Sequence, residues 1–389
     1  MDFLTDYLNE VKQRDLYRAP VSYQPLDAVH VEAEGQRYLL LATNNYLGLT
    51  HSLAVKQAAM TAIEQYGTGS GGARLTTGSH PLYEKLEQEL ALFKSTEAAL
   101  VFNTGYMANV GIISAVVSRG DVIFSDELNH ASIIDGCRLA KGQTVVYRHA
   151  DMAHLAEVLE TTPCQKQRFI VTDGVFSMDG DIAPLDKIVA LAEQYQAMVM
   201  VDDAHAVGVV GRGGRGTVDY FGLTGRVHIQ VGTLSKSLAA EGGYVAGSQA
   251  LIDYLVNKSR SFIFSTALSP GTVAAGYAAL EELQARPELV DKLRDNADYM
   301  RTALVTAGLQ IDGAVTPIIP IVVGEAAVAV EMAQQLKEQG LIVSAIRPPT
   351  VRPGASRLRL TVSAAHDKAD LVRAVEIIIA ISKRLNLIN

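Results

Sequence analysis

The sequence contains no tryptophan, two cysteines, no long apolar run and no run of basic residues. Cys137 and Cys164 are too few for a disulfide framework or a thiolate metal cluster, so we expect both to be apolar fillers in a reducing compartment. No stretch is long and apolar enough to cross a bilayer, and residues 1–15 lack the pattern of a signal peptide. A net charge of −8 without basic runs argues against binding of nucleic acid. We therefore expect a cytoplasmic protein with neither membrane nor nucleic acid as a partner.

The central part of the chain alternates between apolar, strand-like runs and helical segments such as residues 184–195. Several runs are almost entirely apolar and too short for helices, which is typical of strands buried on both faces. Seven such runs are present: 98–102, 121–125, 144–147, 168–173, 197–203, 227–233 and 242–247. This alternation predicts an α/β fold with a mostly parallel, seven-stranded sheet covered by helices.

Three regions are expected from changes in this pattern along the 389 residues. Residues 1–49 read as an amphipathic helix or arm followed by two short strands around the turn Glu34–Gly35. Residues 50–285 form the large α/β domain. Residues 286–389 read as a smaller α+β domain, with helices near 288–307, 325–339 and 368–385 and strands near 317–324 and 357–362.

The stretch QYGTGSGGARLTTGSH, residues 65–80, contains glycines with the spacing of a dinucleotide-binding loop. Such a loop must follow a strand and open a helix. Here a helical pattern precedes Gly67, so glycine ends a helix instead, as helix C-caps favour. The stretch is therefore a helix stop with a flexible connection, or a backbone that lies close to a ligand or another subunit. The rest of the sequence favours the second interpretation.

Polar residues follow five of the predicted strands where each strand ends. They are Asn103–Tyr106, Ser125–Asp126 with His130, Asp173 with Ser177, Asp202–His205, and Thr233–Lys236. Ligands of open α/β sheets bind at the carboxyl ends of strands, so these residues predict a binding site.

Lys236 and Asp202 suggest a specific chemistry when they share one pocket, although each alone has an ordinary structural explanation. Pyridoxal phosphate needs a lysine for its aldehyde and a carboxylate opposite its ring nitrogen. The helix start at Gly105 and Tyr106 suits its phosphate. A metal site at His130, Asp202 and His205 is disfavoured, because these residues match no dense ligand motif.

The chain resembles the α-oxoamine synthases, a subfamily of fold-type-I pyridoxal-phosphate enzymes, over essentially its whole length. The motifs that carry the resemblance are NNYLGL (44–49), GTGSGGARLTTGSHPLYEKLE (67–87), FNTGYMAN (102–109), DELNHASIIDG (126–136), DGVFSMDGDIAPL (173–185), VDDAHAVGVVGRGGRG (201–216), GTLSKS (232–237) and FIFSTALSP (262–270). The resemblance implies a pyridoxal-phosphate-dependent acyltransferase that acts as a homodimer with shared active sites.

The resemblance also implies a role for individual residues. Lys236 matches the Schiff-base lysine, Asp202 the partner of the ring nitrogen, His205 the group that bonds the ring oxygen, and His130 the residue stacked on the ring. The other cofactor-anchoring positions are Gly105, Tyr106, Ser177, Thr233 and Thr266, the last of which reaches the phosphate from the other subunit. The substrate-binding positions are Arg18, Asn44, His130, Thr350 and Arg359, of which Arg359 matches the arginine that binds the amino-acid carboxylate.

Residues 346–366, IRPPTVRPGASRLRLTVSAAH, are most similar to the family member of biotin biosynthesis that joins L-alanine to a pimeloyl thioester. Arg352 departs from that pattern, which has proline or another small residue there. Arg18 matches the arginine that meets the pimeloyl carboxylate, while the sequence leaves open whether coenzyme A or an acyl carrier protein carries the acyl group. The alternatives are condensation of glycine with acetyl-CoA, a dehydrogenase that uses the Gly67 loop, and a catalytically silent scaffold.

Overall fold

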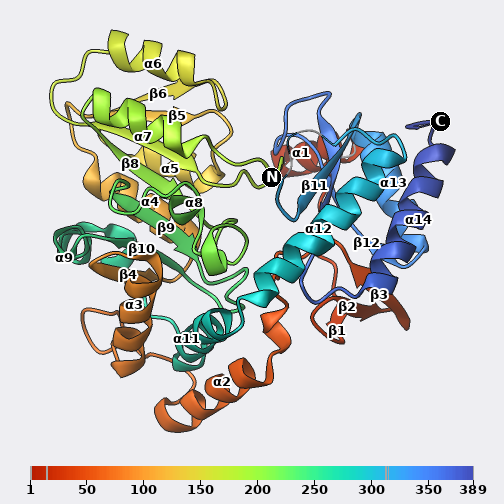
Figure 1. Cartoon of the computed structure of the whole chain (residues 1–389), viewed down its shortest axis with the longest axis horizontal. Helices are drawn as coiled ribbons and strands as arrows, with labels where there is room; N and C mark the ends of the chain where they lie inside the picture. Colours follow the sequence, from red (N-terminus) through yellow and green to blue (C-terminus); the bar gives the residue numbers. More distant parts are fainter. Residues whose placement is uncertain (1, 15, 312, 314, 389) are drawn as a thin grey trace. The chain divides into compact units, whose positions relative to one another are not determined.

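A computed structural model describes residues 2–14, 16–311, 313 and 315–388 (Figure 1). The chain divides into two compact units. Unit 1 comprises Met1–Gly48, Met178–Asp181 and Asp291–Asn389, and unit 2 comprises Leu49–Ser177 and Ile182–Val290. Residues near the two ends of the chain, which the sequence pattern separates into two regions, fall in the same unit because strands from each pair with one another.

Unit 2 is built on a seven-stranded sheet with the order β4-β10-β9-β8-β7-β5-β6. Its strands are β4 (Ala98–Phe102), β5 (Val122–Asp126), β6 (Gln143–Tyr147), β7 (Arg168–Asp173), β8 (Ala197–Asp202), β9 (Ile229–Thr233) and β10 (Gly243–Gly247). Strand β10 pairs antiparallel with both of its neighbours, and the remaining pairs are parallel. The predicted mostly parallel, seven-stranded sheet is confirmed.

Helices cover both faces of this sheet (Figure 1). The helices of unit 2 are α2 (Leu53–Tyr66), α3 (Pro81–Lys94), α4 (Gly105–Val116), α5 (Ala131–Leu139), α6 (Met152–Thr161), α7 (Leu185–Gln194), α8 (Thr217–Tyr220), α9 (Gln249–Lys258), α10 (Arg260–Ile263) and α11 (Pro270–Ala285), with short 3-10 turns at Leu49–His51 and Arg212–Gly214. Successive residues of a strand face opposite sides of a sheet. Accordingly Ile123 packs in a core with α4, α5 and α9, whereas Phe124 packs in another with α6 and α7.

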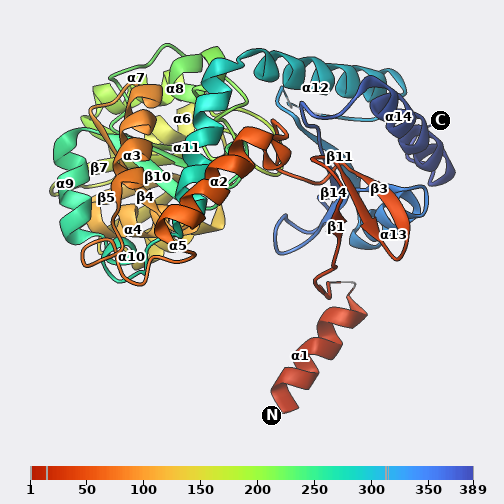
Figure 2. The ribbon, with the colours of Figure 1, turned by 90° about the horizontal axis from the view of Figure 1, so that it is seen from below.

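Among the described residues, unit 1 contains two small sheets, three whole helices and most of a fourth, α12, whose first three residues belong to unit 2 (Figure 2). One sheet has the order β1-β2-β3-β12, with β1 (Gln24–Pro25), β2 (His30–Ala33), β3 (Gln36–Leu40) and β12 (Leu341–Ile342). The other has the order β11-β14-β13, with β11 (Ile318–Gly324), β14 (Ser356–Thr361) and β13 (Ser344–Ile346). The helices are α1 (Asp2–Gln13), α12 (Glu288–Thr306), α13 (Ala326–Glu338) and α14 (Lys368–Arg384).

The core of unit 1 lies between these strands and α12, α13 and α14. The predicted turn at Glu34–Gly35 joins β2 to β3, and both residues have positive φ, 53° and 75°. A tight hairpin turn with two such residues matches the twist of its strands. Helix α1 buries none of its residues. Within the described ranges, no helix combines the length and apolarity needed to cross a membrane.

Candidate active site

The carboxyl ends of the central strands of unit 2 meet at a cavity of about 220 Å³. Asp173, Asp202 and Thr233 are the last residues of β7, β8 and β9. His130 lies just after β5, where it precedes helix α5. The cavity is lined by Thr104, Gly105, Tyr106, Asn109, His130, Ser132, Asp173, Ser177, Asp202, Ala204, His205, Thr233, Ser235 and Lys236. Parallel packing of short buried strands therefore gathers residues that are far apart in the sequence.

Eight of the nine positions predicted to bind a cofactor line this one cavity. They are Gly105, Tyr106, His130, Ser177, Asp202, His205, Thr233 and Lys236. The ninth, Thr266, is an exposed residue that lies outside its lining. The carbonyl oxygen of Thr266 accepts a hydrogen bond from Asn103 Nδ2 at 2.6 Å, and its backbone bridges to Ala73.

The start of helix α4 forms one wall of the cavity. Thr104 caps this helix, because its hydroxyl accepts a hydrogen bond from the backbone N–H of Met107 at 3.0 Å. The N–H groups of Gly105 and Tyr106 lie in the first turn and have no acceptor within the helix. This wall therefore presents open donors at the positive end of a helix, which suits an anion such as a phosphate.

Both carboxylate oxygens of Asp202 accept hydrogen bonds. The backbone N–H of Ala204 donates to Oδ1 at 2.9 Å, and Asn109 Nδ2 donates to Oδ2 at 2.6 Å. Asp202 is 5% exposed and Asn109 is 1% exposed. The carboxylate is thus held in one orientation at the edge of the cavity.

His130 is held at its backbone and at its ring. Its N–H donates to Asp173 Oδ2 at 2.7 Å, and its Nδ1 lies 2.7 Å from the hydroxyl of Ser132. The side chain has substantial exposed surface because it faces the open cavity, yet partial desolvation by the surrounding walls lowers its pKa. The charge of Lys236 lowers the pKa of His130 further, whereas that of Asp202 opposes the shift. His130 is therefore a neutral imidazole at pH 7.

Asp173, which the sequence predicted among the polar residues at strand ends, also lines the cavity, as do Asn109 and Ser132, which were not among those residues. Burial raises the pKa of the Asp173 carboxyl well above its ordinary value, and the nearby Asp202 charge adds to the effect. The position of Asp173 at the end of a predicted strand was the signal that identified it. Asn109 and Ser132 carried no such signal, since both lie within helices.

The glycine-rich stretch that follows α2 packs against residues 266–268. Helix α2 ends at Tyr66, and the N–H of Gly67 bonds to the carbonyl of Ile63 at 2.9 Å. Further on, the N–H of Ala267 donates to the carbonyl of Gly72 at 2.9 Å. A helix, and not a strand, runs into these glycines, so the arrangement of a dinucleotide-binding loop is absent here.

The four predicted substrate-binding residues of unit 1 form two hydrogen-bonded pairs. Arg359 Nη2 donates to Asn44 Oδ1 at 3.2 Å, and Arg18 Nη2 lies 3.4 Å from the hydroxyl of Thr350. Arg359 is on β14 and is 5% exposed, whereas Arg18 and Thr350 are exposed. Each pair thus joins an arginine from one part of the chain to a neutral polar residue from another.

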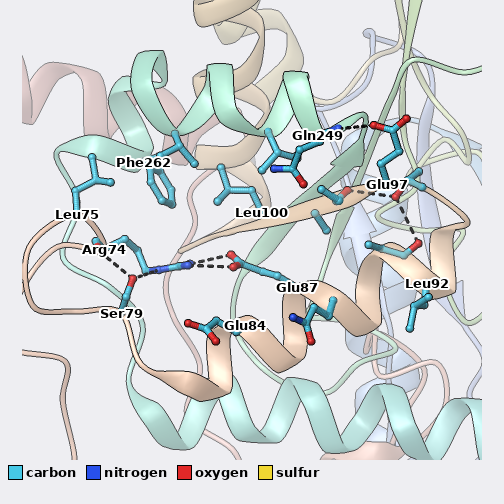
Figure 3. A pocket seen from close by; sticks show the side chains of 17 residues that line it. Arg74, Leu75, Ser79, Glu84, Glu87, Leu92, Glu97, Leu100, Gln249 and Phe262 are labelled. Carbon is cyan, nitrogen blue, oxygen red and sulfur yellow. Dashed lines mark hydrogen bonds and ion pairs between the residues drawn. The ribbon is translucent and has the colours of Figure 1, made fainter.

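A larger cavity of about 690 Å³ lies between α3, β4 and α9 (Figure 3). Arg74 makes two hydrogen bonds to Glu87, at 2.9 and 3.1 Å, and Glu87 also accepts from the backbone of Val101. None of the predicted site residues lines this cavity. Nowhere in the described part of the chain do three or more histidine, cysteine, aspartate or glutamate residues form a cluster that could hold a metal ion.

The chain belongs to the aminotransferase class I and II family, whose pattern matches residues 36–378. It is 48% identical to an 8-amino-7-oxononanoate synthase of Lysinibacillus sphaericus over 98% of both chains. Among solved structures, it is similar to a serine palmitoyltransferase from S. paucimobilis with a bound PLP–myriocin aldimine, at 32% identity and a TM-score of 0.94, covering 100% of this chain and 98% of the other. A Francisella tularensis 8-amino-7-oxononanoate synthase is 29% identical, with a TM-score of 0.77, covering 90% and 99%. The resemblance to the α-oxoamine synthases and the fold-type-I assignment are confirmed.

Proposed function

We propose that the chain is an 8-amino-7-oxononanoate synthase, which condenses L-alanine with a pimeloyl thioester and releases CO2 and the free thiol carrier. The observation that carries this proposal is 48% identity, over 98% of both chains, to a protein of that name. The cavity supports it, because it contains the lysine, carboxylates and anion-binding helix start that such chemistry requires.

The cavity fits pyridoxal phosphate in the chemistry of its donors. Lys236 would hold the aldehyde, the fixed carboxylate of Asp202 would accept a hydrogen bond from the ring nitrogen, and His205 would donate to the ring hydroxyl. The open N–H groups of Gly105 and Tyr106 would bind the phosphate. Bound pyridoxal phosphate supplies an electron-accepting ring that stabilises negative charge at the α-carbon of an amino acid.

Lys236 is the proposed general base, because its amine is a suitable acceptor for the Cα proton of alanine in a partly desolvated pocket. The Cα then forms a bond to the thioester carbonyl carbon, and the C–S bond breaks to release the thiol. The alanine carboxyl group leaves as CO2, and the same Cα takes up a proton. His130, as a neutral imidazole, would donate a hydrogen bond to the new ketone oxygen.

The two pairs in unit 1 are the proposed substrate-binding groups. Arg359, oriented by Asn44, offers a planar guanidinium for the alanine carboxylate. Arg18, beside Thr350, offers a second guanidinium for the distal carboxylate of the pimeloyl chain. We also propose a homodimer in which Thr266 reaches the phosphate bound by the partner subunit.

A panel of substrates tests the proposal directly. The purified protein, loaded with pyridoxal phosphate, is mixed with alanine or glycine and with pimeloyl-CoA, pimeloyl-carrier protein or acetyl-CoA. We expect 8-amino-7-oxononanoate only from alanine with a pimeloyl donor, and borohydride should fix the cofactor to the peptide that contains Lys236. Turnover of glycine with acetyl-CoA alone would instead assign the protein as a glycine C-acetyltransferase.

A further inference from the structure

The amide of Asn109 lies between two residues of the cavity that have separate tasks. Its Nδ2 is 2.6 Å from Asp202 Oδ2 and 2.9 Å from the hydroxyl of Ser132. An amide nitrogen carries two hydrogens, so both are used in these two bonds. The amide oxygen of Asn109, Oδ1, is buried and has no hydrogen-bond partner among the described residues.

This unpaired oxygen indicates why the side-chain amide of Asn109 has this orientation. A buried acceptor without a partner costs about 1–3 kcal/mol, so an amide normally turns to satisfy it. Turning Asn109 by 180° would place Oδ1 against the Asp202 carboxylate and remove the donor to Ser132. The orientation is therefore set by the need for two donors at this point.

A chain of hydrogen bonds runs from Asn109 through Ser132 to His130, and each residue donates to the next. The backbone N–H of Ser132 can only donate, and it points to His130 Nδ1 at 3.3 Å. His130 Nδ1 must then be the acceptor, so it carries no proton in the neutral ring. The Ser132 hydroxyl, which accepts from Asn109, is the donor to the same Nδ1 at 2.7 Å.

We propose that Asn109 is a positioning residue that ties Asp202 to His130 through Ser132 and holds His130 in the tautomer protonated at Nε2. The consequence is that His130 presents a hydrogen-bond donor to the cavity, while Asp202 keeps a fixed orientation toward the cofactor ring. The inference rests on the proposed function for its catalytic meaning, but its geometry stands apart from the choice of substrate.

Matched substitutions separate the effect of the Asn109–Asp202 hydrogen bond from that of the Ser132–His130 hydrogen bond. Ser132→Thr keeps the hydroxyl, and Ser132→Val has the same shape without it, so their difference isolates the bond to His130. Asn109→Leu removes both donors at similar volume. Ser114→Ala is the control, because Ser114 lies on the same helix as Asn109 and its hydroxyl donates to the carbonyl of Val110 within that helix.

The first readout is the tautomer of His130 in cofactor-free protein, from ¹⁵N spectra of histidine-labelled samples at pH 8, with the signal assigned by its loss in His130→Asn. We expect Nε2–H in the wild type, Ser132→Thr and Ser114→Ala, and a partial shift toward Nδ1–H in Ser132→Val and Asn109→Leu, because the 2.7 Å bond from the Ser132 hydroxyl is lost or loosened and the longer 3.3 Å bond from the Ser132 backbone N–H is left to favour Nε2–H. A wild-type ring protonated at Nδ1, or equal spectra for Ser132→Thr and Ser132→Val, would overturn the proposal.

The second readout is the dissociation constant of pyridoxal phosphate. Loss of the charge-assisted bond to Asp202 should weaken binding about tenfold or more in Asn109→Leu. Ser132→Val should bind nearly as the wild type does, because its Asn109–Asp202 bond remains. Unchanged affinity in Asn109→Leu would refute the link to Asp202. Neither readout depends on turnover, so a negative result in the substrate panel can be distinguished from a negative result for these hydrogen bonds.

Discussion

Asp173 and Asp202 are paired in register as the last residues of two adjacent parallel strands, so two buried carboxyl groups stand side by side at the edge of the sheet. Their surroundings differ. Asp202 accepts hydrogen bonds from Ala204 and Asn109, whereas the pKa of Asp173 is raised by burial and by the Asp202 charge. Two neighbouring carboxyl groups thus have different electrostatic environments.

We expect Asp202→Asn to nearly abolish turnover, since the ring nitrogen of the cofactor would lose its carboxylate partner. Asp173→Asn should retain activity within about tenfold, because an amide oxygen still accepts the N–H of His130 at the cost of one hydrogen bond. Steady-state kinetics of the two variants under saturating pyridoxal phosphate check this. Equal losses in both would contradict the separate roles.

Asp173→Asn should also make the cofactor-free protein more stable at neutral pH. A carboxyl whose folded pKa is raised stabilises the fold fully below its unfolded value near 3.8, and that stability is lost as pH rises through the folded pKa. The gain in unfolding free energy from Asp173→Asn should therefore be larger at pH 8 than at pH 5. Denaturation by urea at the two values measures it, with exposed Asp186→Asn as the control.

His366 should make the unfolding free energy decrease as the pH is lowered. Burial lowers its pKa to about 4, from 6.5 in the unfolded chain, and its ring bonds to the backbone of Leu40 and Ser363. As the pH falls, the folded protein therefore binds this proton at a lower pH than the unfolded chain does. About 3 kcal/mol of unfolding free energy should be lost between pH 6.5 and pH 4 from this group. In His366→Gln the pH dependence of the unfolding free energy should flatten by that amount.

Gly78→Ala should weaken binding of pyridoxal phosphate, whereas Gly69→Ala should have no effect. A Cβ at Gly78 would lie 2.3 Å from the carbonyl oxygen of Gly72 and 2.8 Å from the Cβ of Ala267, next to Thr266. A Cβ at Gly69 would meet nothing within 4 Å. Overpacking of this kind costs about 1–3 kcal/mol. Fluorescence titration with the cofactor compares the two, and equal affinity would argue against a role of Thr266 at the phosphate.

Lys94→Met should cost about 3–5 kcal/mol of unfolding free energy, because it leaves the Asp203 carboxylate buried without its cation. The two side chains are 1% and 0% exposed, and Lys94 Nζ lies 2.8 Å from Asp203 Oδ2. Arg226→Met breaks an exposed ion pair with Glu193 and should cost much less, because water already screens both charges. Equilibrium denaturation of both variants would reveal whether burial makes the difference.

Arg359→Lys should raise the KM for alanine, and Arg18→Lys should raise the KM for the pimeloyl donor. Lysine keeps the charge but loses the planar pair of donors that suits a carboxylate. Loss of one charge-assisted hydrogen bond should raise the corresponding KM about tenfold or more. Initial rates with each substrate varied in turn separate the two effects. A change in the same KM for both variants would contradict their assignment to different substrates.

The large sheet and most of the candidate site could be predicted because buried parallel strands are short apolar runs, and polar residues at their ends converge. Asn109 could not be predicted, since in MANVGIISAVV it is one polar residue inside an apolar helix. Strands β1, β12 and β13 contain two or three residues, too few for any periodicity to appear. The common unit of residues 1–48 and 291–389 depends on pairing between distant strands, which a local pattern does not encode.

The pairing of Leu39 with Leu341 has a consequence for how the protein is made. Chains emerge from the ribosome amino end first, and domains generally fold as units. The strands of unit 2 are all complete by Gly247, but β3 can pair with β12 only after residues 341 and 342 have been synthesised. A nascent chain stalled before residue 341 would thus expose an open edge of β3, and because such an edge can pair with another chain, this form of the protein should self-associate most readily.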